Sequence, residues 1–237
     1  MESAALPAVL ITRPEPGAAE TAAACAALGW DAILAPAMLL RPTPPARLPP
    51  AQALLLASRA AARALAPMPL PVLAVGDGTA AEARARGFTD VRAAAGDAAA
   101  LVEAAAATLD PAAGPLLLAV GRGYSAELAT ALRQRGFRVI RRVAYAAAPA
   151  TALPPPAVAA LREGRVGAAL FTSPRGARIT IALLRRAGLA EAARGIRAIA
   201  ISPRIAEALA VLPWSRTDCT ARPDPALLPD HLGPPPV

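Results

Sequence analysis

Lysine is absent from this sequence, and all 25 basic residues are arginine. The phosphate-binding P-loop requires a lysine, so this motif is excluded and ATP is disfavoured as a ligand. Histidine occurs once, as His231, and the two cysteines, Cys25 and Cys219, lie far apart in the chain. These residues form neither a CxxC motif nor a Cys/His cluster. The sequence therefore predicts no metal site and no Cys–His nucleophile pair.

Long apolar runs are also missing, although 55% of the residues are hydrophobic. The longest stretches, such as "ALLLA" and "AMLL", are much shorter than the ~20 residues of a membrane-spanning helix. No basic segment precedes the first apolar run, in contrast to a secretory signal peptide. We therefore expect no membrane association and a cytoplasmic location. Aromatic residues make up only 3% of the chain, so its core must consist mainly of Ala, Leu and Val.

The formal net charge of +8 raises the possibility of nucleic-acid binding. The arginines are spread along the chain, however, and no helix-turn-helix, zinc-finger or aromatic RNA-binding motif accompanies them. This distribution argues against nucleic acid as a partner. A small polyanion is a better match, because the planar guanidinium pairs with carboxylates and phosphates through two hydrogen bonds.

A repeated phrase indicates the fold class: a helical pattern, a glycine, an aromatic residue and then a β-rich run. The phrase occurs as "AALGWDAILAPA" (26–37), "ARARGFTDVRAA" (83–94) and "LRQRGFRVIRRVA" (132–144). A glycine just past a helix is typical of a left-handed C-cap, and the following apolar run starts a strand. Further expected strands, each followed by a helical pattern, are 53–57, 72–75, 116–120, 168–171 and 199–201. Alternating strands and helices predict an α/β protein with parallel sheets.

The chain also resembles itself, which predicts two similar domains. "LITRPEPGAAETAAACAALGWDAI" aligns loosely with "LLLAVGRGYSAELATALRQRGFRVI", "LLLASRAAARAL" with "ALFTSPRGARIT", and "VLAVGDGTAAEA" with "AIAISPRIAEAL". The same order of pieces thus occurs twice. Proline-rich stretches at 35–50 and 144–157 follow the two aligned halves and are typical of linkers.

Candidate binding residues lie where strands run into helices, because ligands of open parallel sheets bind at the carboxyl ends of the strands. Hydroxyl groups, glycines and arginines there suit an anion, although serine and threonine at such positions often serve only as helix caps. Five loops combine these residue types: Thr12-Arg13-Pro14, Ser58-Arg59, Val75-Gly76-Asp77-Gly78-Thr79, Gly121-Arg122-Gly123-Tyr124-Ser125 and Thr172-Ser173-Pro174-Arg175-Gly176.

Neither "VGDG" nor "VGRG" matches the dinucleotide fingerprint, so NAD is disfavoured as well. Tyr145, one of only two tyrosines, is expected at the end of a strand just before a linker. Two readings remain open for this residue. It could be a buried structural side chain, or its phenol could donate a proton to a substrate.

With these motifs in order, the chain resembles the uroporphyrinogen-III synthase family. The resemblance covers about residues 8–212 and rests on the ordered set of blocks rather than on any single motif. "RGFRVIRRVAY" followed by "LFTSP" is its most specific part. It implies two flavodoxin-like/Rossmann-like α/β domains with parallel sheets, joined by a two-stranded linker. The expected division is a first domain of 1–36 plus 153–226, a second of 50–143, linkers at 37–49 and 144–152, and a proline-rich tail at 227–237.

The resemblance also implies a reaction. Enzymes of this family close hydroxymethylbilane, a linear tetrapyrrole with eight carboxylates, while inverting ring D, and they use neither metal nor cofactor. The terminal hydroxyl leaves as water, ring D attacks through its substituted carbon, and a spiro intermediate fragments and recloses. Spontaneous closure gives the I isomer instead of the III isomer. A monomer acting on this small-molecule substrate is therefore expected.

The family's contacts transfer by position to Ser58, Thr79 and Ser173 as hydroxyl or amide donors, and to Tyr145 as the catalytic phenol. One departure is evident: the family usually has Gly-Pro-Thr-Thr where this chain has Ser202-Pro203-Arg204-Ile205. Arg204 is expected to replace the missing threonine. The full set of predicted substrate-binding residues is Thr12, Arg13, Ser58, Gly76, Thr79, Arg122, Gly123, Ser173 and Arg204.

Two other functions remain open from the sequence. A non-catalytic, hinge-type binding protein for an acidic small molecule such as a tetrapyrrole would use the same arginines without turnover. A Rossmann-like enzyme acting on a phosphorylated substrate would use the same loops.

Overall fold

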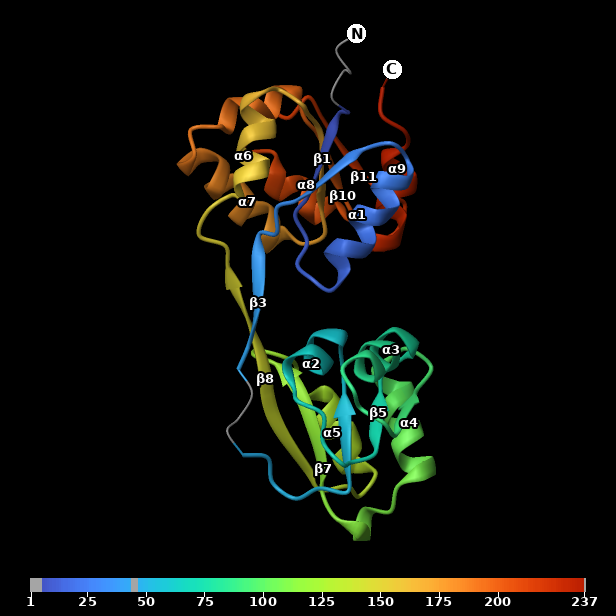
Figure 1. Cartoon of the computed structure of the whole chain (residues 1–237). Helices are drawn as coiled ribbons and strands as arrows, with labels where there is room; N and C mark the ends of the chain where they lie inside the picture. Colours follow the sequence, from blue (N-terminus) through green and yellow to red (C-terminus); the bar gives the residue numbers. More distant parts are fainter. Residues whose placement is uncertain (1–5, 44–46, 237) are drawn as a thin grey trace. The chain divides into compact units, whose positions relative to one another are not determined.

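The computed structural model describes residues 6–43 and 47–236, and the chain divides into two compact units. Unit 1 combines Met1–Leu39 with Ala148–Val237, and unit 2 consists of Leu40–Ala147. Each unit is built on its own sheet, and both are drawn in Figure 1. Within the described ranges, no helix is long and apolar enough to cross a membrane.

Unit 1 contains a five-stranded sheet in the order β11-β10-β9-β1-β2, in which all neighbouring strands are parallel. Its elements are β1 (Ala8–Ile11), α1 (Gly17–Ala27), β2 (Asp31–Leu34), α6 (Pro155–Arg162), β9 (Val166–Phe171), α7 (Pro174–Arg186), η2 (Ala190–Gly195), β10 (Arg197–Ala200), α8 (Pro203–Leu209), β11 (Arg216–Cys219), η3 (Pro225–Leu227) and α9 (Leu228–Leu232). The central strands are buried on both faces, which explains why β1 and β9 are almost uninterrupted apolar runs.

Unit 2 contains a six-stranded sheet in the order β3-β8-β7-β4-β5-β6. The pairs β8–β7, β7–β4, β4–β5 and β5–β6 are parallel. Its elements are β3 (Met38–Pro42), β4 (Ala53–Leu56), α2 (Arg59–Ala64), β5 (Val72–Ala74), α3 (Asp77–Ala85), β6 (Val91–Ala93), α4 (Ala98–Thr108), η1 (Pro111–Ala113), β7 (Leu116–Gly121), α5 (Glu127–Gln134) and β8 (Val139–Pro149). The predicted α/β class with parallel sheets is confirmed.

Alternation along the strands of unit 2 separates its core into two layers. Leu54 and Leu117 pack on one face with residues of α2 and α3, whereas Leu55 and Leu118 pack on the other with residues of α4 and α5. All four leucines are fully buried. A strand that reads "ALLL" therefore has no polar face, because helices cover both sides of the sheet.

Glycines after helices have the conformation that the repeated phrase predicts. Gly29, Gly87 and Gly136 follow α1, α3 and α5 with φ values of 95°, 94° and 87°. The backbone of a residue with a Cβ atom is strained in this left-handed region, whereas that of glycine is not. Each glycine thus ends a helix and starts the turn into the next strand.

Cys25 lies on the buried side of α1. Burial raises the pKa of its thiol to about 11. The thiol therefore stays protonated at neutral pH and is a packing group rather than a nucleophile.

The two segments predicted as linkers contain more strand than their prolines suggest. β3 covers Met38–Pro42 and β8 continues to Pro149, and the two strands are neighbours in the sheet of unit 2. The amide of Thr43 donates to the carbonyl of Ala144 at 2.8 Å. Tyr145 consequently lies inside β8 and not at a strand end, because backbone pairing continues on both sides of it. Pro44 and Pro45 lie outside the described residues.

The C-terminal segment is tied to unit 1 by an ionic cluster around Asp218, whose side chain is only 10% exposed. Arg197 donates to Asp218 at 2.5 Å and to the carbonyls of Leu232 and His231 at 3.0 and 3.1 Å. Arg216 donates to the other carboxylate oxygen at 2.6 Å. Burial alone would raise the pKa of Asp218, but the hydrogen bonds from both arginines outweigh burial and lower it. One carboxylate thus links β10, β11 and, through Arg197, α9.

Asp218→Asn is expected to destabilise unit 1 by about 1–3 kcal/mol, because it removes charged hydrogen bonds from a largely buried site. Arg216 is mostly exposed and contributes little. A carboxylate with a lowered pKa stabilises the fold above its unfolded value of about 3.9 and loses this contribution as the pH falls through its folded value. Both tryptophans, Trp30 and Trp214, belong to unit 1, so urea unfolding followed by their fluorescence measures this unit.

The variant should therefore lose less stability than the wild type when the pH falls from 5 toward 3. Asp230→Asn is the matched control, since Asp230 is an exposed carboxylate of α9. Equal unfolding midpoints for Asp218→Asn and Asp230→Asn at neutral pH would show that the cluster contributes nothing.

Candidate functional site

The carboxyl end of the unit 2 sheet brings three of the predicted residues, Tyr145, Ser58 and Gly76, into line with Gly121, because its strands run parallel. Gly121 ends β7, whereas Ser58 and Gly76 each follow their strand, β4 and β5, after one intervening residue. The strands are adjacent in the order β8-β7-β4-β5. Tyr145, Gly121, Ser58 and Gly76 therefore succeed one another along the sheet. This is the place where open parallel sheets bind ligands.

The ring of Tyr145 lies directly over Gly121. A Cβ built on Gly121 would be only 2.7 Å from Cζ and 2.9 Å from the phenol oxygen of Tyr145. Any side chain at position 121 would therefore collide with the ring. The adjacent backbone is also fixed, since the amide of Arg122 donates to the carbonyl of Tyr145 at 2.8 Å. Gly121 beneath the ring and the pairing of β8 with β7 thus fix the position of the half-buried phenol.

Ser58 is the polar neighbour of the Tyr145 phenol. Its Oγ lies 3.3 Å from the Tyr145 oxygen, and either hydroxyl can be the donor. The same Oγ accepts the amide of Ala61 at 3.1 Å and caps α2. Because capping uses only an oxygen lone pair, the Ser58 hydroxyl proton can still be donated to the Tyr145 oxygen. Ser58 is thus both a helix cap and a support for the phenol.

Gly76 precedes α3 as its N-cap residue, in extended conformation, and its backbone packs against that of Gly96. A Cβ on Gly76 would be 2.9 Å from the Cα of Gly96, so the close approach requires glycine. Thr79 lies in the first turn of α3 and is 95% buried, with its amide donating to the carbonyl of Gly76 at 3.0 Å. Both residues lie at the carboxyl end of β5, and their role in binding stays a prediction.

Arg122 and Gly123 form an exposed turn immediately after β7. Gly123 has a φ of 79°, and a Cβ there would meet nothing within 4 Å. The turn is held by Arg141, whose guanidinium donates to the carbonyl of Tyr124 at 2.7 Å. Arg122 is therefore an exposed residue on an anchored turn next to the Tyr145 strand.

In unit 1, Thr12 and Arg13 follow β1 and make contacts within that unit. The hydroxyl of Thr12 donates to the carbonyl of Leu170 at 2.6 Å and ties β1 to β9. The hydroxyl proton of Thr12 is thus already donated, and only the lone pairs of the oxygen remain available for a ligand. The Arg13 guanidinium lies over Gly17 at the start of α1 and donates to the Thr21 hydroxyl at 3.0 Å. The predicted contacts of both residues with substrate are not tested by this geometry.

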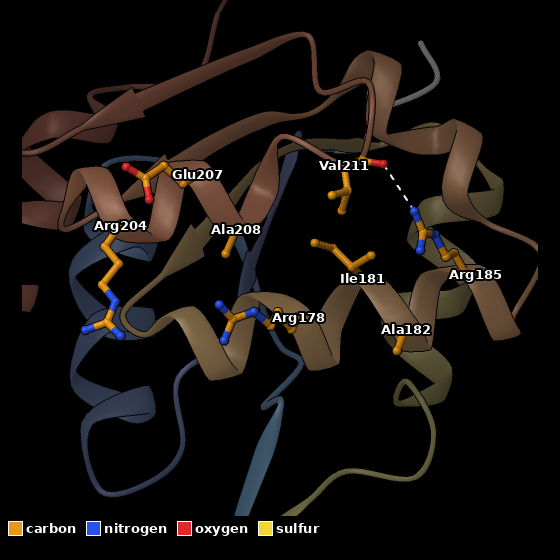
Figure 2. Close-up of a pocket in the computed structure, with 8 residues that line it drawn as sticks. All are labelled: Arg178, Ile181, Ala182, Arg185, Arg204, Glu207, Ala208 and Val211. Atoms are coloured by element: carbon orange, nitrogen blue, oxygen red, sulfur yellow. Dashed lines mark hydrogen bonds between the residues drawn. The ribbon is translucent and has the colours of Figure 1, made fainter.

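Ser173 and Arg204 follow β9 and β10 at the carboxyl end of the unit 1 sheet. Ser173 caps α7 by accepting the amide of Gly176 at 3.0 Å. Arg204 is an exposed residue in the first turn of α8. Figure 2 shows its guanidinium at one end of a groove between α7 and α8. Thr12, Ser173 and Arg204 therefore occupy successive positions along β1, β9 and β10.

The structure thus collects the predicted residues into two sets, one at the carboxyl end of each sheet. Sequence reasoning missed two neighbours of these sets. Gly121 was noted as a loop glycine, but its role as the seat of the Tyr145 ring depends on the pairing of β7 with β8. Arg178, which lines the same groove as Arg204, lies one turn inside α7. Within residues 6–43 and 47–236, no group of three or more His, Cys, Asp or Glu side chains could hold a metal ion.

These observations define a class: a two-unit α/β protein that presents hydroxyls, glycine-lined turns and arginines at the carboxyl ends of two parallel sheets. Such donors suit a ligand with several carboxylates. The family model described as Uroporphyrinogen-III synthase HemD matches residues 19–228, and the chain belongs to this family. It is therefore a lyase of tetrapyrrole (haem) biosynthesis that cyclises hydroxymethylbilane to uroporphyrinogen III.

A solved structure of the family from Helicobacter pylori shares this fold. Uroporphyrinogen-III synthetase from Helicobacter pylori is 17% identical, with 96% of this chain and 98% of that one covered and a TM-score of 0.58. Uroporphyrinogen III synthase from Thermus thermophilus is 19% identical, with 96% of each chain covered and a TM-score of 0.40. A comparison with curated protein sequences gives no significant match.

Proposed function

We propose that Tyr145 is the general acid of the cyclisation and that Ser58 supports it. The observation that carries this proposal is the phenol held on Gly121, 3.3 Å from the Ser58 hydroxyl. When the substrate hydroxyl leaves, a proton from the phenol converts it to water. The phenolate that remains accepts a hydrogen bond from Ser58, whose position is fixed by its bond to Ala61. A positioned acid of this kind contributes about 10²-fold or more to a rate.

The remaining predicted residues act by positioning the substrate. Spontaneous closure at the free carbon of ring D gives the I isomer, so the enzyme must hold the chain in the conformation that leads to attack through the substituted carbon. We propose that donors of both sheets hold the substrate in this conformation, namely Thr12, Arg13, Ser58, Gly76, Thr79, Arg122, Gly123, Ser173 and Arg204. No metal or cofactor is required in this scheme, since proton transfer and positioning suffice.

Product analysis tests the proposal directly. Purified protein is mixed with hydroxymethylbilane, the products are oxidised to porphyrins, and the III and I isomers are separated. We expect the III isomer, whereas the substrate alone yields the I isomer. Formation of the I isomer only, together with measurable tetrapyrrole binding, would support the non-catalytic binding protein that the family match disfavours.

Substrate affinity is expected to weaken as ionic strength rises, because exposed arginines such as Arg122 and Arg204 attract the substrate carboxylates. Exposed charges are screened beyond about 8–10 Å near physiological salt. The apparent KM, measured between low and high sodium chloride concentrations, should therefore increase. A KM that does not change with salt would indicate that backbone amides, rather than arginine side chains, dominate binding.

We also propose that the protein acts as a monomer in the cytoplasm. Each of the two sets of residues assigned above lies within one unit of this chain, which suits sites built by a single subunit. Both cysteines are free, which suits a reducing compartment. Light scattering during size-exclusion chromatography checks the first point, and a mass of about twice 23.9 kDa would refute it.

A further inference from the structure

A groove between α7 and α8 of unit 1 includes Arg204, one of the proposed substrate-binding residues, and extends over residues that have no role assigned so far. Its volume is about 710 Å³, and its lining residues come from these two helices and the turn after α8. Figure 2 shows them: Arg178, Ile181, Ala182, Arg185, Arg204, Glu207, Ala208 and Val211. Small-molecule sites have volumes of about 300–1,000 Å³, so the groove is large enough for an organic ligand.

The charged residues of the groove differ in their contacts with the rest of the protein. Arg185 donates to the carbonyl of Val211 at 3.2 Å. Arg178 and Arg204 are exposed, and neither makes a hydrogen bond or ion pair with another residue in the described part of the chain. Figure 2 shows both guanidinium groups toward the same end of the groove, with Arg185 at the other end. The single acidic residue, Glu207, leaves the groove with an excess of positive charge.

Between these charges the groove has an apolar floor. Ile181 is buried between the helices, Ala182 and Ala208 expose only methyl groups, and Val211 is 58% exposed. An exposed aliphatic side chain of this kind covers no core and is available for contact with a ligand. The combination suits a ligand that is apolar in its centre and carries carboxylates at its rim.

We propose that this groove binds a carboxylate-bearing pyrrole ring, with the ring on the apolar floor and its carboxylates on Arg178 and Arg204. The assignment rests on the proposed function, which brings tetrapyrroles of this chemistry to the protein. Guanidinium groups pair with carboxylates in a planar, two-bond arrangement that fits acidic side chains on a ring. The open substrate and the closed product both carry such rings, and the experiment separates them.

The probe is a monopyrrole with one acetate and one propionate side chain, titrated to millimolar concentration and followed by NMR of methyl groups. The methyl resonances of Ile181 and Val211 should shift. Arg178→Ala combined with Arg204→Ala should weaken binding by about fivefold, and Glu207→Gln should strengthen it by removing a repelling charge. Arg186→Ala is the matched control, because Arg186 is exposed on the same helix α7 but does not line the groove.

Closed and open tetrapyrroles are then compared. Binding of uroporphyrin, the oxidised and stable form of the closed product, tests whether the groove binds the product. The KM for hydroxymethylbilane in the single variant Arg178→Ala tests whether the groove binds the substrate, because Arg204 is already assigned to the substrate. An increase relative to Arg186→Ala assigns the groove to the substrate. Unchanged Ile181 and Val211 resonances, or equal losses with Arg186→Ala, would overturn the proposal. Shifts with an acidic peptide but not with the pyrrole would also overturn it, by identifying the groove as a protein-docking surface.

The binding assay requires no turnover, so it can fail independently of the proposed function. Formation of only the I isomer with an intact pyrrole titration would refute catalysis and leave the groove assignment standing. Formation of the III isomer with no pyrrole binding would support catalysis and refute the groove assignment.

Discussion

Tyr145→Phe is expected to lower turnover by about 10²-fold, because it removes the proton that converts the leaving hydroxyl to water. The ring itself still fits over Gly121, so the fold should be unchanged. The enzyme should continue to form the III isomer, since positioning of the substrate does not depend on the phenol. The fraction of I isomer should nevertheless rise, because slower catalysis gives spontaneous closure more time to compete. Turnover is measured with freshly prepared hydroxymethylbilane, and both isomers are quantified.

Tyr124→Phe is the matched control for this experiment. Tyr124 is the only other tyrosine, its side chain is 37% exposed, and the contact that anchors its turn uses its backbone carbonyl. Removing its hydroxyl should leave turnover unchanged. If Tyr145→Phe retained full activity, Tyr145 would be a packing residue and catalysis would depend on positioning alone.

The internal repeat of the sequence predicts two similar domains, and the two sheets do have equivalent strand orders. The aligned segments correspond to β1 and β7, to β9 and β4, and to β10 and β5. In unit 1 the strands follow the order β2-β1-β9-β10-β11, and in unit 2 the equivalent order is β8-β7-β4-β5-β6. Two copies of the same sequence pattern therefore form the same sheet, because hydrophobic periodicity and glycine C-caps act locally.

Strands with mixed polarity were harder to predict. β11 reads "RTDC", with Arg216 and Thr217 exposed at the edge of the sheet, so it has no apolar run to indicate a strand. Its position is set by pairing with β10 and by the bonds of Asp218 to two arginines. Such long-range partners leave no signal in a local window of sequence.

The candidate site was predictable only as a set of loops. The sequence indicated that Ser58 and Tyr145 both carry hydroxyls near strand ends, but 87 residues separate them, and their 3.3 Å contact depends on the adjacency of β4, β7 and β8. The bond from Thr12 to Leu170 spans 158 residues in the same way. Residue types at strand ends identify candidates, whereas the assignment of partners requires the sheet.

Gly121→Ala is expected to have a second large effect on turnover, because it displaces the Tyr145 phenol without removing its hydroxyl. The added Cβ would be 2.7–2.9 Å from three atoms of Tyr145, closer than carbon atoms can approach without a shift. The ring must therefore move, and its contact with Ser58 should be lost. We expect turnover to fall by about 10²-fold, as in Tyr145→Phe, with a smaller change in KM. Gly195→Ala is the control, since a Cβ at Gly195 meets nothing within 4 Å.

The turnover of the double variant Gly121→Ala/Tyr145→Phe shows whether Gly121 affects catalysis through Tyr145. If both single changes remove the same proton donor, the double variant should be no slower than either single variant. A multiplied loss of about 10⁴-fold would instead show that Gly121 contributes independently, for example through its own backbone in substrate binding. Circular dichroism must accompany these rates, because the two tryptophans report only on unit 1 and Gly121 lies in unit 2. Unchanged spectra with a non-additive loss would establish that the missing side chain at position 121 is what places the catalytic phenol.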